Sequence, residues 1–290
     1  MPVGDDCDTV DPRAPAETGG IRRIASNVWR VVAENPGPLT GPGTNTYVVG
    51  AGRRIVIDPG PADAAHVERI LALTGGRIDT ILCTHSHPDH SPGAVPLRAA
   101  TGAVVRGMPA PDDGYQDEQY APDRALSDGE WLESEGSRLL VVHTPGHASN
   151  HACLLLEENG LLFTGDHLMS GSTVVILPPD GSMRQYLESL RRLRGMPVCG
   201  LGPGHGAMIE DGHAEIDRVI AHRLKREAKV VASLRRQGTA TLDELLPAVY
   251  DDVPAALHPV ARHSLLAHVL KLLEEGRASN HGDHWTWRDG

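Results

Sequence analysis

Four side chains that bind metal ions well lie within the short segment Thr84-His85-Ser86-His87-Pro88-Asp89-His90. Imidazole nitrogens suit zinc and related divalent ions, and the carboxylate oxygen adds a harder ligand that can also accept protons. His85 and His87 are two residues apart, so in an extended loop they point the same way. Asp89 and His90 follow a proline that presets a turn, so they can face a second ion. The complete string indicates a metal-binding loop rather than a surface histidine cluster.

Other elements must supply the remaining ligands, because one loop is too short to surround two ions. An apolar run over 80–83 predicts a buried strand that ends at this loop. Three later runs, 139–142, 160–164 and 198–201, predict strands that lead through glycine-containing turns to His147, Asp166 and His205. Glycine permits the tight turns that place a side chain at the end of a strand. A single His or Asp where a strand meets a loop is more typical of a turn or a helix cap. Together with the loop 84–90, however, the three residues complete two coordination spheres.

Five motifs, in this order and spacing, resemble those of the metallo-beta-lactamase superfamily. They are Val56-Ile57-Asp58-Pro59-Gly60, the segment 84–90, His147, Asp166 and His205. The resemblance covers about residues 21–210. That block alternates apolar strands with helices over 62–73 and 183–193, a texture typical of two packed sheets covered by helices. We therefore expect an α+β fold, a four-layer αββα sandwich.

The resemblance also implies a role for each candidate residue. His85, His87 and His147 would hold one metal, Asp89, His90 and His205 would hold the other, and Asp166 would bridge the two. Asp58 would support the metal-binding loop by hydrogen bonding, without touching a metal. Two divalent ions that share a water lower its pKa, so that a bridging hydroxide can attack an electrophilic carbonyl or phosphorus. Asp89 would have a supporting acid/base role in catalysis, and zinc is the expected metal, with iron or manganese also compatible.

Flanking segments narrow the resemblance to the beta-lactamase-like-protein-2 group. Segments 35–38, 43–50 and 151–159 carry it, and the ligand set is similar to that of glyoxalase II. The group includes a mitochondrial single-strand endoribonuclease, and fungal thioesterases that release polyketides are related to it. The bridging Asp166 and an acidic N-terminus without an apolar signal segment disfavour an exported, antibiotic-hydrolysing enzyme.

Composition and charge exclude several classes of protein. The 290-residue chain has a net charge of −11, which argues against a protein that coats nucleic acid. Four widely spaced cysteines, Cys7, Cys83, Cys153 and Cys199, predict free thiols and a cytoplasmic location. Since no segment approaches eighteen consecutive apolar residues, we expect no membrane contact.

The chain is expected to have three parts: a disordered tail at 1–20, a catalytic domain at 21–211 and a C-terminal domain at 212–290. Within the catalytic domain, the Pro-, Asp- and Gly-rich segment 107–130 is expected to be a surface loop that borders the substrate cleft. The C-terminal domain should contain helices over 211–237, 242–249 and 258–275 and a closing two-strand hairpin, which resembles a winged-helix domain.

Charge within the C-terminal domain tests whether that domain binds nucleic acid. Segment 218–236 has seven lysines and arginines and only one acidic residue, Glu227. Such a stripe could contact RNA phosphates, but the favoured interpretation is a solvated helix face or a salt-bridge partner for the acidic main domain. The third helix, which would read DNA, has only Arg262 and Lys271 as basic residues.

The sequence therefore predicts a dinuclear metal-dependent hydrolase that acts on a thioester or ester, either a small acyl compound or a carrier-bound one. Metal-dependent cleavage of single-stranded RNA is the alternative activity. A non-catalytic or DNA-binding regulator that acts through the winged helix is the alternative of another class. The pattern does not determine the oligomeric state.

Overall fold

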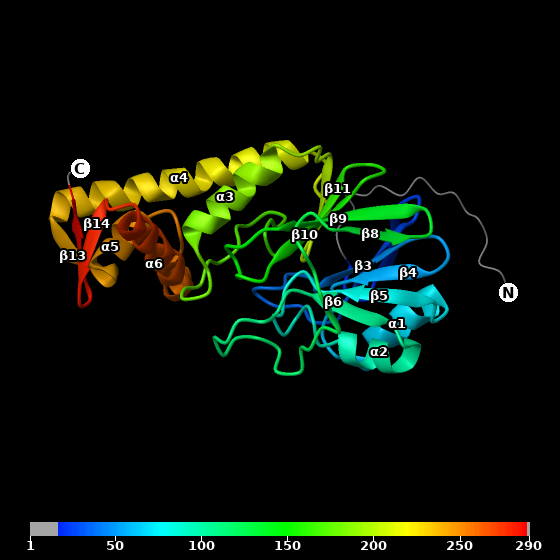
Figure 1. Ribbon diagram of the computed structural model, residues 1–290. Helices are drawn as coiled ribbons and strands as arrows, with labels where there is room; N and C mark the ends of the chain where they lie inside the picture. Colours follow the sequence, from blue (N-terminus) through cyan, green and yellow to red (C-terminus); the bar gives the residue numbers. More distant parts are fainter. Residues whose placement is uncertain (1–16, 289–290) are drawn as a thin grey trace.

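The computed structural model describes residues 17–288 and packs two β-sheets face to face between layers of helices (Figure 1). This confirms the α+β class and the four-layer αββα sandwich. Most of the predicted disordered tail, residues 1–20, lies outside the described residues. Its last part, 17–20, contacts the first sheet, where Gly19 N donates to Val32 O (3.1 Å).

The first sheet contains seven strands within the described residues, and their spatial order is their chain order. They are β1 (Ile21–Ala25), β2 (Val28–Val32), β3 (Asn45–Val49), β4 (Arg54–Ile57), β5 (Ile78–Leu82), β6 (Val104–Gly107) and β7 (Arg124–Ala125). The pairings from β1 to β4 are antiparallel and those from β4 to β7 are parallel. Parallel neighbours need a crossover, and helices α1 (Ala64–Thr74) and α2 (Ala94–Thr101) provide the first two.

The second sheet, in the part of the chain described, has five strands in the order β12-β11-β10-β9-β8. They are β8 (Trp131–Ser134), β9 (Ser137–His143), β10 (Ala152–Leu156), β11 (Leu161–Gly165) and β12 (Gly200–Pro203). β10 is antiparallel to both β9 and β11, and β11 is parallel to β12 across the helix α3 (Met183–Arg194). Strands β9, β11 and β12 therefore run the same way and end at the same edge.

Central strands of both sheets are buried on both faces, which explains their continuous apolar runs. In β3, Tyr47 and Val49 pack between the sheets, while Val48 packs with residues of α1 and α2. In β10, Leu154 lies between the sheets and Leu155 faces the layer formed by α3. The alternation with period two thus divides each strand between two cores.

The C-terminal region combines helices with a small sheet. Its helices are α4 (Gly212–Gln237), α5 (Leu242–Val249), the short 3₁₀ helix η1 (Ala255–Leu257) and α6 (His258–Glu274). They agree with the predicted helices to within about two residues. Strands β14 (Ala278–His281) and β15 (His284–Trp287) form the predicted hairpin, and β13 (Thr239–Thr241) adds an unpredicted third strand. Three residues are too few to show a strand alternation, so no pattern in the chain marks β13.

Helix α4 is shared by the two parts of the molecule. Ile216 and Val219 pack in the core beneath α3, whereas Val230 and Leu234 pack in the C-terminal core. The division at residues 211 and 212 stays a prediction, and the helix that follows it links both cores. Among the described helices, α4 included, none combines the length and apolar character needed to span a lipid bilayer.

Candidate metal centre

All predicted ligands lie at the edge where strands β4, β5, β9, β11 and β12 end. The loops that follow these strands contribute, in chain order, Asp58, then His85, His87, Asp89 and His90, then His147, Asp166 and His205. The seven ligand-type residues converge there, and Asp58 joins them through its hydrogen bond with His90, so five strand ends spanning 147 positions of sequence contribute to one cluster. We call this cluster the candidate metal centre.

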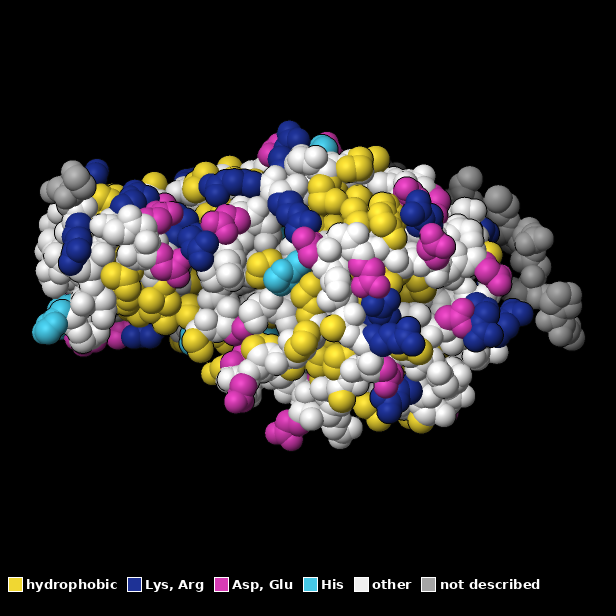
Figure 2. Space-filling view, in the orientation of Figure 1, with side chains coloured by type: hydrophobic (Ala, Val, Ile, Leu, Met, Phe, Trp, Pro, Cys, Tyr) yellow, Lys and Arg dark blue, Asp and Glu magenta, His cyan; other side chains and the backbone are white. Residues whose placement is uncertain are grey.

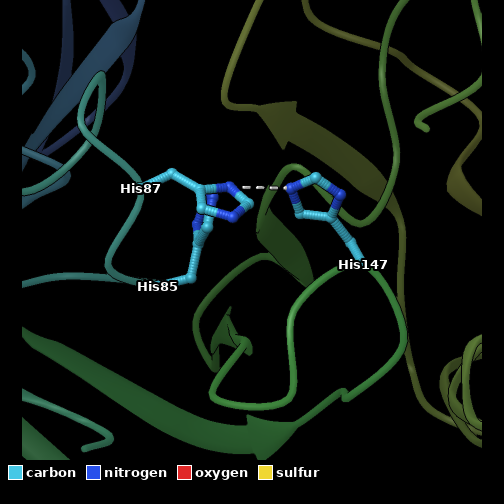
Figure 3. Close-up of side chains that lie close together, drawn as sticks. All are labelled: His85, His87 and His147. Carbon is cyan, nitrogen blue, oxygen red and sulfur yellow. Dashed lines mark hydrogen bonds between the residues drawn. The ribbon is translucent and has the colours of Figure 1, made fainter. Parts of the chain in front are cut away.

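The first group of possible ligands is a triad of histidines from two loops. Figure 3 shows His85 and His87 on one loop and His147 reaching toward them from the other. His87 Nδ1 and His147 Nε2 are 3.1 Å apart, and the three ligand-type atoms lie within 4.8 Å of one another. Nitrogen ligands about 2.1 Å from a tetrahedral zinc ion stand about 3.4 Å apart, so this triad has a suitable size.

The second triad combines Asp89, His90 and His205, again with ligand-type atoms within 4.8 Å of one another. Asp89 Oδ2 is 3.2 Å from His205 Nε2 and 3.6 Å from His90 Nε2. The two histidines are almost fully buried, whereas the Asp89 side chain is 30% exposed. Asp89 is therefore the member of this triad most accessible from solvent.

Asp166 lies between the triads and faces both. Its Oδ1 is 3.3 Å from His90 Nε2 and 3.3 Å from His205 Nε2. Its Oδ2 is 3.7 Å from His147 Nε2, in the first triad. One carboxylate with an oxygen toward each group is the arrangement that a bridging ligand requires.

Several polar atoms of the cluster are buried without a hydrogen-bond partner among the described residues: His85 Nε2, His90 Nε2 and Asp166 Oδ1. Buried polar atoms in folded proteins nearly always have a partner, so unsatisfied atoms that converge require an explanation. A pair of divalent cations would satisfy these atoms, because imidazole and carboxylate are suitable ligands for them. The donor set therefore fits the metals implied by the sequence.

Hydrogen bonds to the other ring nitrogen fix which tautomer three of these histidines adopt. The acceptors are Asp58 Oδ2 for His90 (3.0 Å), Val175 O for His147 (2.9 Å) and Gly43 O for His205 (3.3 Å). A carboxylate or carbonyl oxygen can only accept, so each Nδ1 carries the proton. In the neutral form of each ring, Nε2 therefore presents a lone pair to the centre, as metal ligation requires.

Asp58 holds the start of the metal-binding loop. Its carboxylate accepts from Thr84 N (2.7 Å) and Thr84 Oγ1 (2.8 Å) as well as from His90. Because the Thr84 hydroxyl donates to Asp58, its oxygen accepts from His85 Nδ1 (3.0 Å) and fixes that tautomer too. Asp58 has φ of 49°, an uncommon conformation that aspartate tolerates better than most residues. Sequence reasoning missed the relay through Thr84, for which a lone threonine gives no signal.

Two glycines are needed where the sheets approach each other. A Cβ on Gly204 would lie 2.7 Å from Asp166 Oδ1 and 2.7 Å from His90 Cε1. Gly165 has φ of 44°, and its Cβ would lie 2.4 Å from Thr84 Oγ1. Any side chain at either position would displace groups of the centre.

Segment 108–123, the irregular part of the predicted loop 107–130, is fastened to the metal-binding loop. Asp117 N donates to Ser86 O (2.8 Å), and Ser91 Oγ donates to Asp117 Oδ2 (2.8 Å). From the opposite side, Asn150 Nδ2 donates to Ser86 Oγ (2.7 Å). These polar residues hold the backbone between the two triads. Neither their residue types nor their spacing in the sequence predicted these contacts.

Three further histidines flank the motifs and belong to neither triad. His151 is buried, bonds through Nδ1 to Thr144 Oγ1 (2.9 Å) and packs with its ring 5.1 Å from that of His85. His167 is buried 4.6 Å from the Tyr186 ring, and His143 contacts the Ser149 carbonyl. These contacts indicate a structural role for the three histidines.

The charges of the two triads differ in the metal-free protein. Burial lowers the pKa of His85 well below its usual range and that of His87 to about 4, so both are neutral at pH 7. Burial by itself would lower the pKa of His205. The carboxylates of Asp166 and Asp89 outweigh this effect and raise the pKa of His205 to about 9. The pKa of His90 is likewise raised well above its usual range by nearby carboxylates, against the effect of burial. Protons thus occupy the second triad where a metal would bind.

We expect metal binding at the second triad to depend on pH more strongly than at the first. Its histidines must release about one to two protons near pH 7, so its affinity should rise with pH until about pH 9. In the first triad, the neutral His85 and His87 should release almost none. Calorimetric titration with Zn²⁺ in buffers of different ionisation enthalpy measures this release. Equal proton release for both ions would contradict the assignment.

The same pKa shift links the metal-free fold to pH. Because the pKa of His205 is raised from 6.5 to about 9, its pairing with Asp166 stabilises the fold fully below about pH 6.5. That contribution is lost as the pH rises through about 9.

The basic stripe of α4 is largely engaged within the molecule. Arg223 and Arg226 are 3% and 6% exposed. Arg223 donates to Val174 O, and Arg226 pairs with Asp252 (2.6 Å). Among the others, Arg218 pairs with Glu215 and Lys229 with Asp251. This favours the salt-bridge interpretation, although the carboxylates belong to the C-terminal domain and not to the catalytic domain.

The two cations of the third helix are also paired. Arg262 contacts Asp243 (2.6 Å), and Lys271, which is 7% exposed, contacts Glu227 (2.7 Å). A helix that reads DNA keeps its basic side chains free for phosphates and bases, so this arrangement argues against such a role.

Comparison with known families now identifies the class of protein. Residues 39–205 match the metallo-beta-lactamase superfamily, and residues 241–287 match the beta-lactamase associated winged helix domain. The first match covers more than half of the chain. The chain therefore belongs to the metallo-beta-lactamase superfamily and is a hydrolase of that class, with a C-terminal winged helix domain.

Individual relatives extend over nearly the whole chain. A beta-lactamase-like protein 2 homolog from Drosophila melanogaster is 32% identical over 89% of this chain and 91% of its own length. An atrochrysone carboxyl ACP thioesterase from Aspergillus chevalieri is 34% identical over 89% of this chain and 84% of its own. A solved metallo-beta-lactamase family protein from Thermus thermophilus has a TM-score of 0.75 and 26% identity over 92% of this chain and 100% of its own. These matches confirm the resemblance carried by the motifs.

Proposed function

We propose that the chain is a dinuclear metal-dependent hydrolase of acyl thioesters or esters, with zinc as the metal. One observation carries the proposal: Asp166 directs one oxygen to the second triad (3.3 Å) and the other to the first (3.7 Å). The ligands would be His85, His87 and His147 for one ion, Asp89, His90 and His205 for the other, and Asp166 for both. Iron or manganese would suit the same donors.

When bound, two such cations supply Lewis acidity that ionises a water near neutral pH and polarises the acyl carbonyl. The residues of the chain would orient the metal ligands and accept the proton that the water releases. Asp58 and Thr84 orient two of the imidazoles, as described above. Asp89 is the most accessible carboxylate of the centre. The nearby His90 and His205 lower its pKa against the effect of its partial burial, so it is ionised and able to accept a proton. We assign it this supporting acid/base role.

Thioesters are favoured by the Aspergillus chevalieri relative, whose name specifies a thioesterase. Cleavage of RNA has weaker support, because four of the seven basic residues of the stripe are bonded within the molecule and the chain has a net charge of −11. A purely regulatory role through the winged helix is disfavoured by the paired cations of α6 and by the complete set of seven ligand-type residues. A cytoplasmic location stays a prediction.

The test is a substrate panel with purified protein loaded with Zn²⁺, Fe²⁺ or Mn²⁺. We expect hydrolysis of thioesters and esters that is abolished by a chelator and restored by metal. His147→Ala should abolish it, and His213→Ala, at the start of α4 and outside the centre, should not. Activity confined to phosphodiesters, or activity that survives the loss of His147, would show that the proposal is wrong.

A further inference from the structure

Three irregular segments surround the candidate metal centre, and each is hydrogen-bonded to it. The contacts are His205 Nδ1 to Gly43 O (3.3 Å) in segment 35–44, Asp117 N to Ser86 O (2.8 Å) in segment 108–123, and His147 Nδ1 to Val175 O (2.9 Å) in segment 167–182. Because the sheets close the inner side of the centre, a substrate has to approach past these segments. We call the three segments together the rim.

The rim contains no lysine and no arginine. It has six carboxylates: Asp112, Asp113, Asp117, Glu118, Asp123 and Asp180. Asp112 and Glu118 are exposed. In Figure 2, acidic but no basic side chains mark the lobe at the lower centre, where Figure 1 places segment 108–123. Grouped carboxylates that outnumber the nearby cations give this approach a negative potential.

Within residues 17–288, the cations that come near the rim are buried or paired, with one exception. Arg30 and Arg223 reach the backbone carbonyls of Gly206 and Val174, but they are only 1% and 3% exposed. The arginines flanking segment 108–123 are Arg98, paired with Asp123 (3.0 Å), Arg106, paired with Glu130 (2.7 Å), and Arg124, which is exposed on β7. With Asp123 paired to Arg98, the exposed Arg124 does not balance the five remaining carboxylates.

The rim also exposes large apolar side chains. Leu39 is 68% exposed on segment 35–44, and Tyr115 is 55% exposed on segment 108–123. The C-terminal domain continues this surface, because Ile176 N of segment 167–182 donates to Ser264 Oγ on α6 (3.4 Å). Val260 lies one turn before Ser264 on the same face of α6 and is 40% exposed.

We propose that the rim selects acyl esters and thioesters that have an apolar acyl chain and no anionic group. This rests on the proposed function and narrows its substrates to small acyl compounds, away from carrier-bound ones. Phosphate groups are recognised by arginine and lysine, and the rim offers neither. A phosphopantetheine arm or a nucleotide would lie against carboxylates instead. Hydrolysis itself is unchanged: water adds its hydroxyl to the acyl carbon, the C–S or C–O bond breaks, and the leaving atom takes the proton.

The experiment compares two octanoyl thioesters with the metal-loaded full chain, one of neutral N-acetylcysteamine and one of phosphopantetheine. We expect kcat/KM to be at least about tenfold higher for the neutral thioester at low salt. Added salt should narrow the difference, because it screens the exposed carboxylates. Equal or faster hydrolysis of the phosphopantetheine thioester would overturn the selectivity while leaving the hydrolase intact. No hydrolysis of either thioester would contradict the proposed function and the selectivity with it.

A matched pair of variants separates the rim from general charge effects. Asp112→Asn with Glu118→Gln removes two exposed rim carboxylates and should reduce the ratio of the two kcat/KM values by about threefold or more. Glu133→Gln with Glu135→Gln removes two exposed carboxylates from the β8–β9 hairpin, at the opposite ends of the strands. The ratio should stay unchanged there. A ratio that moves equally in both variants would overturn the role of the rim.

Discussion

Replacing Asp166 by alanine is expected to lower kcat/KM by at least about a thousandfold, which corresponds to roughly 4 kcal/mol of transition-state stabilisation. The reason is geometric, since Asp166 is the carboxylate that approaches both triads, at 3.3 Å and 3.7 Å. Without Asp166, no ligand would be shared between the two triads. Metal content should fall from two ions per chain to one or fewer.

Elemental analysis after dialysis and steady-state kinetics measure the two effects, and circular dichroism checks that the variant folds. Asp112→Asn is the matched control, because it changes an exposed carboxylate at the same edge of the sheets and should keep two ions. An alanine variant that retains both ions and loses less than about tenfold in kcat/KM would show that Asp166 is not the bridge.

Local sequence patterns sufficed for the metal-binding loop and for most helices. His85, His87, Asp89 and His90 are neighbours in the chain, so their convergence follows from strand alternation and one proline turn. Helix α5 has its complete capping box, Thr241 with Glu244, within four residues. Features that are specified by residues close together in the chain can be predicted from the sequence.

Two of the partners that orient the histidines could not be predicted, because they are backbone oxygens. Gly43 and Val175 act through their carbonyls, which every residue possesses, and they lie in segments without apolar periodicity. Their contacts span 162 and 28 positions of sequence. Only the topology of the two sheets brings these segments to the same edge.

The basic stripe shows a different limit, because its pattern left both a solvated helix face and a salt-bridge role open. Counting charges along α4 could not decide between them, and the structure buries Arg223 and Arg226. Their partners, Val174 and Asp252, lie 49 and 26 positions away, so charge counting within the helix could not find them. The rim could not be predicted for the same reason. The sequence shows that three separate segments lack lysine and arginine, but it does not show that these segments meet around the metal centre.

Replacing Asp58 by alanine should lower metal affinity by about 10- to 100-fold although Asp58 belongs to neither triad. The substitution leaves Thr84 N and His90 Nδ1 buried without an acceptor, which should destabilise the metal-free fold by about 3 kcal/mol. Competition with a chromophoric chelator measures the affinity, and urea unfolding measures the stability. Asp63→Asn, which alters only the N-cap of α1, is the control and should keep full metal affinity.

Asp58→Asn distinguishes a loss of charge from a loss of tautomer control. Asparagine tolerates the positive φ of this position and can still accept from Thr84 N, so part of the stability should return. Its amide nitrogen can only donate, which forces His90 to accept at Nδ1 and to carry its proton on Nε2. That proton would occupy the atom facing Asp166 and Asp89. Metal affinity should therefore stay as low as in the alanine variant, and an asparagine variant that binds both ions normally would show that Asp58 does not set the tautomer.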